Sequence, residues 1–226
     1  WNMGGVWLSW QMAEYYRFTR DRNFLQEEAY PVMKQAALFC LDQLREGADG
    51  FLRATPATSP ENWFLLDGEP CAVASSVAMT NSMVRHLFLA CVQAAEELMI
   101  DADFREELAA ALAKLEPYRI GSHGQLLEWD QEYPETDPHH RHVSQLFGLY
   151  PGDDLLDSTH PELPEACRQT LNDRGDDGSG WSLSWKVSLW ARLRDGDRAL
   201  KLLQNQLRWV DAKTISYEGG GGSYPN

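Results

Sequence analysis

The chain has 226 residues, 43% of them hydrophobic, which is enough for one sizeable core or two small ones. Acidic residues (34) outnumber basic residues (20), and the formal net charge of -14 argues against nucleic acid or an anionic membrane as a partner. No apolar run in the sequence is long enough to cross a bilayer, and the composition favours a globular protein with a neutral ligand.

The first half of the chain shows helical spacing of its apolar residues. Steps of three and four residues predict helices over 5–18, 23–44, 77–98 and 103–115. Asn23-Phe-Leu-Gln26 and Asp103-Phe-Arg-Glu106 have the form of capping boxes, and Pro31 predicts a kink in the second helix. Residues 47–75 are rich in Gly, Pro, Asp and Thr and are expected to form a long loop, which is usually a functional feature.

The second half continues the helical pattern after an irregular connection. We expect a short helix over 143–149 and longer helices over 159–171, 181–193 and 199–209. No stretch alternates convincingly with a period of two residues. The sequence therefore predicts an all-α chain with about eight helices.

Three short turns between the predicted helices resemble one another. They are Thr19-Arg-Asp-Arg-Asn-Phe24, Met99-Ile-Asp-Ala-Asp-Phe104 and Leu193-Arg-Asp-Gly-Asp-Arg198. A turn that recurs between paired helices indicates repeated helical hairpins, with the long loops gathered at the opposite end. This arrangement is typical of an α/α toroid, which presents a site at its mouth. About four hairpins are predicted where a closed toroid of this kind has six, so we expect an incomplete barrel.

Glu128 lies among apolar neighbours in the stretch Gly121-Ser-His-Gly-Gln-Leu-Leu-Glu-Trp-Asp130. Apolar surroundings disfavour the charged form of a carboxyl group, which is how a general acid is kept protonated. The alternative is a surface glutamate on an irregular connection. The other long connections favour the acid, because polar and aromatic side chains suited to sugar binding gather there.

Two of those connections carry candidate ligand-binding groups. Glu61 and Asn62 stand beside Trp63, and Arg141 and His142 end the run His139-His-Arg-His142. These side chains suit hydrogen bonds to sugar hydroxyls, whereas four adjacent residues cannot all converge on one metal ion. The alternative for each segment is a loop that only caps its neighbours.

Other motifs have ordinary structural explanations. Asp153-Asp-Leu-Leu-Asp157 matches the D-D-x-x-D pattern by which all-α terpene synthases hold magnesium and diphosphate, but acids at a helix start also complement the helix dipole. Trp181 and Trp185, four residues apart on one helix face, are expected to pack in the core, with lining the same cavity as Arg141 and His142 as the alternative. Gly219 to Gly222 follow no strand, so a phosphate cradle is not expected. We predict neither a metal nor a cofactor.

Many ordered runs of the sequence resemble glycoside hydrolase family 95, the α-L-fucosidases with some α-L-galactosidases. They include Tyr15-Tyr-Arg-Phe-Thr-Arg-Asp21, Tyr30-Pro-Val-Met-Lys34, Ser59-Pro-Glu-Asn62, Arg119-Ile-Gly121, Gly124-Gln-Leu-Leu-Glu-Trp129, His140-Arg-His-Val-Ser144, Tyr150-Pro-Gly152, Arg174-Gly-Asp176 and Gly180-Trp-Ser182. The resemblance covers nearly the whole chain. It implies an (α/α)6 barrel, and we expect residues 1–226 to be an incomplete catalytic barrel domain truncated at both ends.

The resemblance also implies an inverting mechanism, in which a glutamate protonates the glycosidic oxygen while an asparagine assisted by an aspartate activates water. Glu128 matches the acid. Arg141 and His142, with Glu61, Asn62 and Trp129, are expected to hold the sugar. The water-activating residues match no position here, so the fragment alone is expected to be inactive. Met79-Thr80 also departs from the Met-Asp usual in the family.

The predicted function is hydrolysis of α-L-fucosidic bonds, with a fucosylated oligosaccharide as substrate and the remaining barrel segments of the same polypeptide as partner. One alternative is a carbohydrate-binding helical domain without catalysis, in which Glu128 has no base opposite. A metal- and diphosphate-dependent protein like the terpene synthases is the other.

Overall fold

The computed structural model describes residues 1–207, and the chain divides into two compact units. The first unit contains residues 1–59 and 73–118, and the second contains residues 60–72 and the chain from residue 119 onward. The predicted helix end at Trp209 and the segment Gly219 to Gly222 lie outside the described residues.

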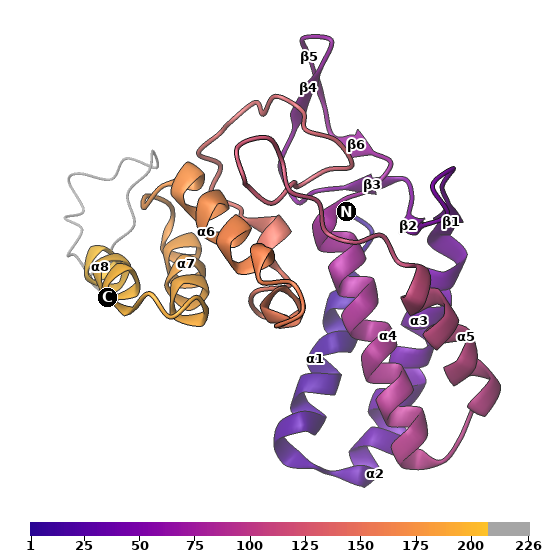
Figure 1. The fold of residues 1–226 in the computed structure, drawn as a ribbon. Coiled ribbons are helices and arrows are strands. Elements are labelled where there is room, and N and C mark those ends of the chain that lie inside the picture. Colours follow the sequence, from indigo (N-terminus) through magenta and orange to yellow (C-terminus); the bar gives the residue numbers. More distant parts are fainter. Residues whose placement is uncertain (208–226) are drawn as a thin grey trace. The chain divides into compact units, whose positions relative to one another are not determined.

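The first unit is a bundle of helices around α4. Its helices are α1 (Gly4–Thr19), α2 (Arg22–Phe24), α3 (Tyr30–Gln43), α4 (Ala78–Leu98) and α5 (Ala102–Lys114). Helix α4 contacts α1, α3 and α5, and Figure 1 shows these helices side by side. Because it has neighbours on several sides, α4 buries residues around much of its circumference, among them Val84, Leu87, Phe88 and Cys91.

The three predicted turns share a backbone feature. Arg20, Met99 and Arg194 all adopt left-handed φ angles, of 56°, 58° and 60°. In the first and third turns the next residue is an aspartate that caps the following helix: Asp21 accepts from the backbone N–H of Asn23 and Phe24, and Asp195 from that of Arg198. The similarity of the turns thus has a local cause, which is a left-handed residue followed by an N-cap.

Both predicted capping boxes are wrong by two residues. The first helix after α1 begins at the cap Asp21 rather than Asn23, because the Asp21 carboxylate already satisfies two backbone donors there. Helix α5 begins after Asp101, whose Oδ2 instead accepts from the Tyr30 hydroxyl at 2.8 Å and the Lys34 ammonium at 2.6 Å. Asp103 lies in the first turn of α5, where a negative charge suits the helix dipole.

A π-helical turn, Leu25–Ala29, lies immediately before α3, which has Pro31 in its first turn. Proline has no backbone N–H to donate to the preceding turn. The chain widens there, and the Tyr30 N–H bonds to the Leu25 carbonyl five residues back. The helix continues through the proline instead of ending.

The predicted all-helical character is correct for most of the chain, but the expected loop over 47–75 contains short strands. Antiparallel pairs form between β1 (Leu44–Glu46) and β2 (Leu52–Ala54), β3 (Ala57–Thr58) and β6 (Val73–Ala74), and β4 (Phe64–Leu66) and β5 (Glu69–Cys71). Each strand has only two or three residues. Alternation over so short a length is not visible in a sequence.

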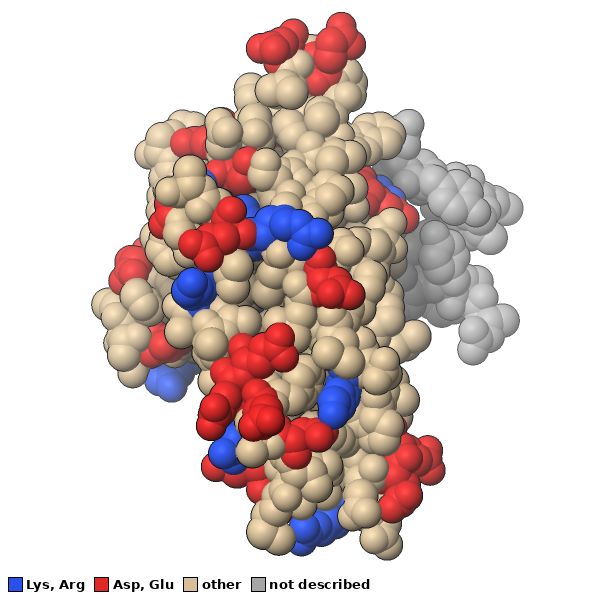
Figure 2. All heavy atoms as spheres, turned by 90° about the vertical axis from the view of Figure 1, so that its right-hand side faces the viewer, with Lys and Arg blue, Asp and Glu red and all other residues tan. Residues whose placement is uncertain are grey.

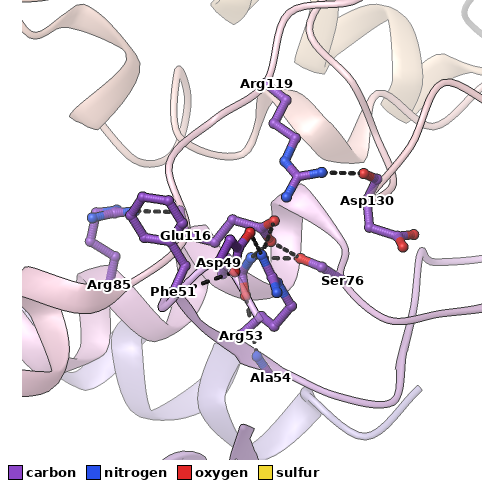
Figure 3. A network of polar contacts seen from close by, with 10 residues as sticks. Asp49, Phe51, Arg53, Ala54, Ser76, Arg85, Glu116, Arg119 and Asp130 are labelled. Atoms are coloured by element: carbon purple, nitrogen blue, oxygen red, sulfur yellow. Dashed lines mark hydrogen bonds and ion pairs between the residues drawn. The ribbon is translucent and has the colours of Figure 1, made fainter. Parts of the chain in front are cut away.

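A buried carboxylate joins the strands of the first unit to α4 (Figure 3). Glu116 is 4% exposed; its Oε1 accepts from Arg53 at 2.9 Å, and its Oε2 accepts from Asn81 at 3.1 Å and from the Ser76 hydroxyl. The Glu116 carbonyl accepts from Arg85 of α4 at 3.1 Å. Polar groups at this depth are tolerated because they are bonded to one another.

The second unit carries the later helices, α6 (Glu162–Arg174), α7 (Gly180–Arg192) and α8 (Gly196–Gln206). Two short 3-10 turns, Ser144–Leu146 and Asp154–Leu156, precede α6. The first replaces the short helix predicted over 143–149. Helices α7 and α8 form a hairpin through the Arg194 turn, and the connection from α6 to α7 stands at the opposite end of α7.

The excess of acidic over basic residues in the sequence is visible on the surface. On the face drawn in Figure 2, acidic side chains are spread widely with isolated basic side chains between them. Among residues 1–207, no helix has both the length and the apolarity that crossing a membrane requires.

Replacing Glu116 with alanine should destabilise the protein by about 2–3 kcal/mol, because the buried Ser76 hydroxyl loses its acceptor and Arg53 keeps only the more exposed Asp49 carboxylate. The free energy of unfolding in urea measures this. Glu46→Ala is the matched control, since its ion pair with Lys114 is exposed and should be worth less than about 1 kcal/mol. Equal losses for the two variants would contradict a structural role for the buried network.

Candidate active site

Glu128 is presented by a tight hairpin at the start of the second unit. Backbone bonds join Leu127 N–H to the Arg119 carbonyl at 2.9 Å and Gly121 N–H to the Gln125 carbonyl at 2.8 Å. The turn needs Gly124, whose φ of +81° is costly for residues with a Cβ.

Side chains brace the two ends of this hairpin. Arg119 donates to the Asp130 carbonyl, as Figure 3 shows. Glu132 accepts from the Ser122 N–H at 2.9 Å and from the Gln125 amide at 2.9 Å, and these bonds hold the pKa of Glu132 below its usual value. The braced backbone fixes the direction in which Glu128 leaves the hairpin.

The carboxyl group of Glu128 is buried, with the residue 3% exposed. Its Oε2 accepts from the Arg174 Nη2 at 2.8 Å and from the Asn62 amide at 3.0 Å. Two of the residues predicted for the site, Asn62 and Glu128, are therefore in direct contact although 66 positions separate them.

Arg174 is shared by a second carboxylate. Its Nη1 pairs with Glu135 and also donates to the Pro138 carbonyl at 2.9 Å. Burial raises the pKa of Glu135, the Arg174 charge opposes that rise, and the Glu128 charge adds to it. One guanidinium thus holds two carboxylates and a backbone carbonyl.

Strand β4 brings Asn62 and Glu135 next to Arg174 and Glu128. Residues 134–136 pair with β4: Leu65 N–H donates to the Pro134 carbonyl at 2.8 Å, and Phe64 forms an antiparallel bridge with Glu135. Asn62 precedes the same strand. The two side chains that flank Arg174 and Glu128 therefore come from adjacent segments of one small sheet.

Glu61, Arg141 and His142 form a second cluster in the same unit. Glu61 Oε2 contacts the Arg141 guanidinium and lies 3.1 Å from His142 Nε2. The Arg141 charge holds the pKa of Glu61 below its usual value, with the His142 contact contributing. Burial lowers the pKa of His142, and Arg141 lowers it further, while Glu61 opposes the shift.

The loop that carries Arg141 is tied to the start of α7. Ser182 Oγ donates to the Arg141 carbonyl at 2.6 Å, and the Trp181 ring meets His142 edge-on at 4.7 Å between centroids. Trp181 is 47% exposed, so the expectation that it packs in the core is wrong. Trp185 donates its Nε1–H to the Tyr150 carbonyl at 2.8 Å.

Trp129 follows Glu128 into the interior. It is 4% exposed and packs against Phe64 with ring centroids 5.2 Å apart. Its buried Nε1 has no hydrogen-bond partner among residues 1–207.

The metal-binding alternatives gain no geometric support. Within residues 1–207, no three His, Cys, Asp or Glu side chains are grouped so that they could hold a metal ion. In the D-D-x-x-D motif, Asp157 Oδ1 accepts from the Thr159 N–H at 2.8 Å, and in the histidine run His140 Nδ1 accepts from the His142 N–H at 3.1 Å. In each motif, a side chain thus accepts a hydrogen bond from a backbone N–H of its own loop.

Comparison with known proteins agrees with the resemblance. The sequence profile of the glycosyl hydrolase family 95 catalytic domain matches residues 1–226. The chain belongs to glycosyl hydrolase family 95. "Alpha-L-fucosidase 2" from Arabidopsis thaliana is 40% identical over 223 residues, which are 97% of this chain and 26% of that protein. "Probable alpha-fucosidase A" from Aspergillus niger is 28% identical over 205 residues, 86% of this chain and 25% of that protein.

The chain spans about a quarter of the length of these curated family 95 relatives. Membership in the family leaves the terpene-synthase alternative without support, because the profile covers the whole chain, including the D-D-x-x-D motif.

Arg174 and Glu135 were not predicted as members of this family 95 site. The sequence held one signal for Arg174, since a glutamate placed in apolar surroundings needs a buried cation or must stay protonated. Arg174 also lies at the C-terminal end of α6, where a cation complements the helix dipole. Nothing in the local sequence distinguishes Glu135 from other acidic loop residues, because its place depends on the pairing with β4.

His140, next to Arg141 and His142, makes the stability of the fold depend on pH. Burial lowers the pKa of His140 to about 4 from 6.5, and the neighbouring His142 and Arg141 charges contribute. Between these pH values the unfolded chain binds a proton that the folded chain does not, so stability falls as the pH falls through this window. The loss attributable to His140 is on the order of 3 kcal/mol.

His140→Asn should reduce this acid-side loss, because an asparagine oxygen can still accept from the His142 N–H but the side chain cannot be protonated. Urea unfolding at several pH values between 6.5 and 4 measures the effect. The exposed His160, replaced by Asn in the same way, is the control. An unchanged pH dependence in His140→Asn would show that another group causes the loss.

Proposed function

We propose that this chain is the part of an inverting α-L-fucosidase that supplies the general acid, Glu128. One observation carries the proposal: in a family 95 catalytic domain, a buried glutamate is held in a fixed orientation by Asn62 and Arg174. The names of the relatives support a fucoside as the substrate class.

In the proposed reaction, Glu128 gives its proton to the glycosidic oxygen as the bond between that oxygen and the anomeric carbon breaks. Water attacks the anomeric carbon from the opposite face and loses a proton to a base. Asn62 and Arg174 both donate to Oε2 and so fix the orientation of the carboxyl group. The base, an asparagine assisted by an aspartate according to the family resemblance, belongs to segments outside this chain.

The Glu61, Arg141 and His142 cluster is proposed to hold the sugar, with Asn62 and Trp129 contributing. Arg141 donates several N–H groups, Glu61 accepts, and His142 can do either as a neutral ring, so hydroxyl groups of either orientation are accommodated. The edge of Trp181 beside His142 adds an apolar wall. The acid and base carry the chemistry, so the proposal needs no metal or cofactor.

We further propose that the helical hairpins contribute about four of the six in an (α/α)6 toroid, and that the remaining segments of a longer polypeptide complete it. The share of the relatives covered by this chain supports this. Helix α8 has exposed leucines at Leu200, Leu203 and Leu207, a spacing that places them on one helix face.

If such segments are missing, the isolated chain should bind a hydrophobic dye such as anilinonaphthalene sulfonate under native conditions and should not hydrolyse fucosides. Dye fluorescence and analytical ultracentrifugation check this. A monodisperse monomer that unfolds cooperatively and binds no dye would contradict the incomplete toroid.

A second candidate function is sugar binding without catalysis. The ion pair between Arg174 and Glu128 favours it, because an ionised carboxylate suits a hydrogen-bond acceptor for a sugar hydroxyl better than a proton donor. The two functions differ in how the rate depends on the leaving group.

In the intact enzyme, Glu128→Gln removes the transferable proton and keeps the size of the side chain. General acid catalysis commonly contributes about a hundred- to ten-thousandfold in rate, so hydrolysis of a fucosyl disaccharide should fall by this factor. An aryl fucoside or fucosyl fluoride needs little protonation and should lose much less.

Steady-state kinetics on both substrate types provide the measurement, with Glu162→Gln at the far end of α6 as the control. Equal losses on both substrates would assign Glu128 a positioning role. Near-normal hydrolysis of the disaccharide would remove it from the mechanism.

A further inference from the structure

A general acid that forms an ion pair with arginine poses a chemical problem. Arg174 Nη2 lies 2.8 Å from Glu128 Oε2, and both side chains are almost fully buried, at 2% and 1% exposure. A cation at this distance stabilises the carboxylate and opposes the protonation that the proposed function requires. Some other group must offset this effect for Glu128 to carry a proton.

Glu135 is placed to offset it. Its carboxylate contacts Arg174 Nη1, so the two branches of one guanidinium face two different carboxylates. Glu135 is fixed there by the backbone bridge to Phe64 and by the neighbouring bonds of Thr136 to the Trp63 carbonyl, at 3.3 Å from N and 3.0 Å from Oγ1. The arrangement is built into the sheet that contains β4.

The charges in this cluster do not cancel. Two ionised carboxylates and one guanidinium leave a net charge of -1; Arg174 and Glu128 are almost fully buried, Glu135 is 27% exposed, and Asp137 adds a negative charge close to Glu135. An excess negative charge in a desolvated site favours the uptake of one proton. Burial is the main cause of the raised pKa of Glu135; Arg174 opposes it, and the Glu128 and Asp137 charges add to it.

The other basic groups described near this cluster are neutral or have partners of their own. His140 has its pKa lowered to about 4, and His142 has its pKa lowered as well, so both rings are neutral near pH 7. Arg141 is paired with Glu61. Lys186 of α7 has its pKa lowered to about 8 by burial and stays mostly charged near pH 7, but it donates to the Gly175 and Asp177 carbonyls, at 2.9 and 2.7 Å, and the carboxylates that act on it are Asp176 and Asp177.

We propose that Glu135 is a positioning residue for the acid: by sharing Arg174 it leaves the Glu128–Arg174–Glu135 cluster one positive charge short, so that the cluster binds a proton which Glu128 can donate. The proton belongs to the coupled pair of carboxyl groups rather than to either residue alone. This inference rests on the proposed function only in that Glu128 donates the proton to the glycosidic oxygen. The uptake of the proton by the cluster does not depend on that function.

The change Glu135→Gln tests the proposal because it removes one negative charge and keeps the shape. Arg174 then compensates Glu128 alone, and the cluster should release its proton at a pH lower by about one unit or more. The infrared C=O stretch of protonated carboxyl groups, followed against pH in the chain itself, reports this release. The Glu128→Gln variant identifies the band of the cluster by difference.

Kinetics of the intact enzyme add a second readout. With a fucosyl disaccharide, the alkaline limb of the pH profile of kcat/KM should move to lower pH in Glu135→Gln, by about one unit. With an aryl fucoside the profile should change little, since the acid is hardly needed. Glu135→Asp keeps the charge and should restore much of the normal profile, and Glu162→Gln should leave both profiles unchanged.

The outcomes separate the two proposals. A carboxyl band that keeps its pH dependence in Glu135→Gln would overturn the role of Glu135, as would equal losses on both substrates at every pH. If the intact protein hydrolyses no fucoside, the proposed function fails while the infrared result still decides whether the cluster holds a proton. If Glu135→Gln does not fold, Glu135→Asp with its weaker contact to Arg174 should show a smaller shift in the same direction.

Discussion

The buried guanidinium of Arg174 is the interaction on which the second unit depends. It joins the end of α6 to Glu128, 46 positions earlier in the chain, and to Glu135, 39 positions earlier. A charge at 2% exposure is stable only with partners in good geometry, and removing one partner of such a pair commonly costs about 3–5 kcal/mol. The same contacts therefore hold the fold together and set the charge at the proposed acid.

The surrounding structure serves to keep this arginine in place. Helix α6 ends at Arg174, and Gly175, with a φ of 73°, turns the chain away at once. Lys186 holds the carbonyls of the connection that follows, and Ser182 holds the carbonyl of Arg141. A lysine is an expensive residue to bury, and here it donates to two carbonyl groups at the end of α6 and in the loop that follows. The two polar clusters are thus attached to one helix, α7.

Much of the fold could be predicted from the sequence because helical spacing is a local signal. Helix α7, expected over 181–193, is observed as Gly180–Arg192, and the three similar turns all contain a left-handed residue. The caps were misplaced because several aspartates near each turn compete for the same backbone donors, and only the folded geometry decides between Asp21 and Asn23. The strands of residues 44–74 were missed because pairing over two or three residues leaves no periodic pattern.

The site residues also divide into those that local sequence signals predicted and those that depend on long-range pairing. Glu128, Asn62, Glu61, Arg141 and His142 were proposed from residue type and family resemblance, and the structure brings them into two neighbouring clusters within one unit. Arg174 and Glu135 depend on long-range pairing and had to be observed. Trp181 was assigned to the core because a tryptophan four residues from another on a helix usually packs inward, yet it is exposed beside His142.

Burial alone does not distinguish an acid from a structural carboxylate, and this chain contains both arrangements. Glu116 and Glu128 are 4% and 3% exposed. Each of them shares its arginine with a second carboxylate: Arg53 also pairs with Asp49, and Arg174 also pairs with Glu135. Asp49 is 44% exposed, and its bond to Arg53 lowers its pKa, whereas Glu135 is 27% exposed and burial raises its pKa. The surroundings of the second carboxylate therefore separate the two arrangements.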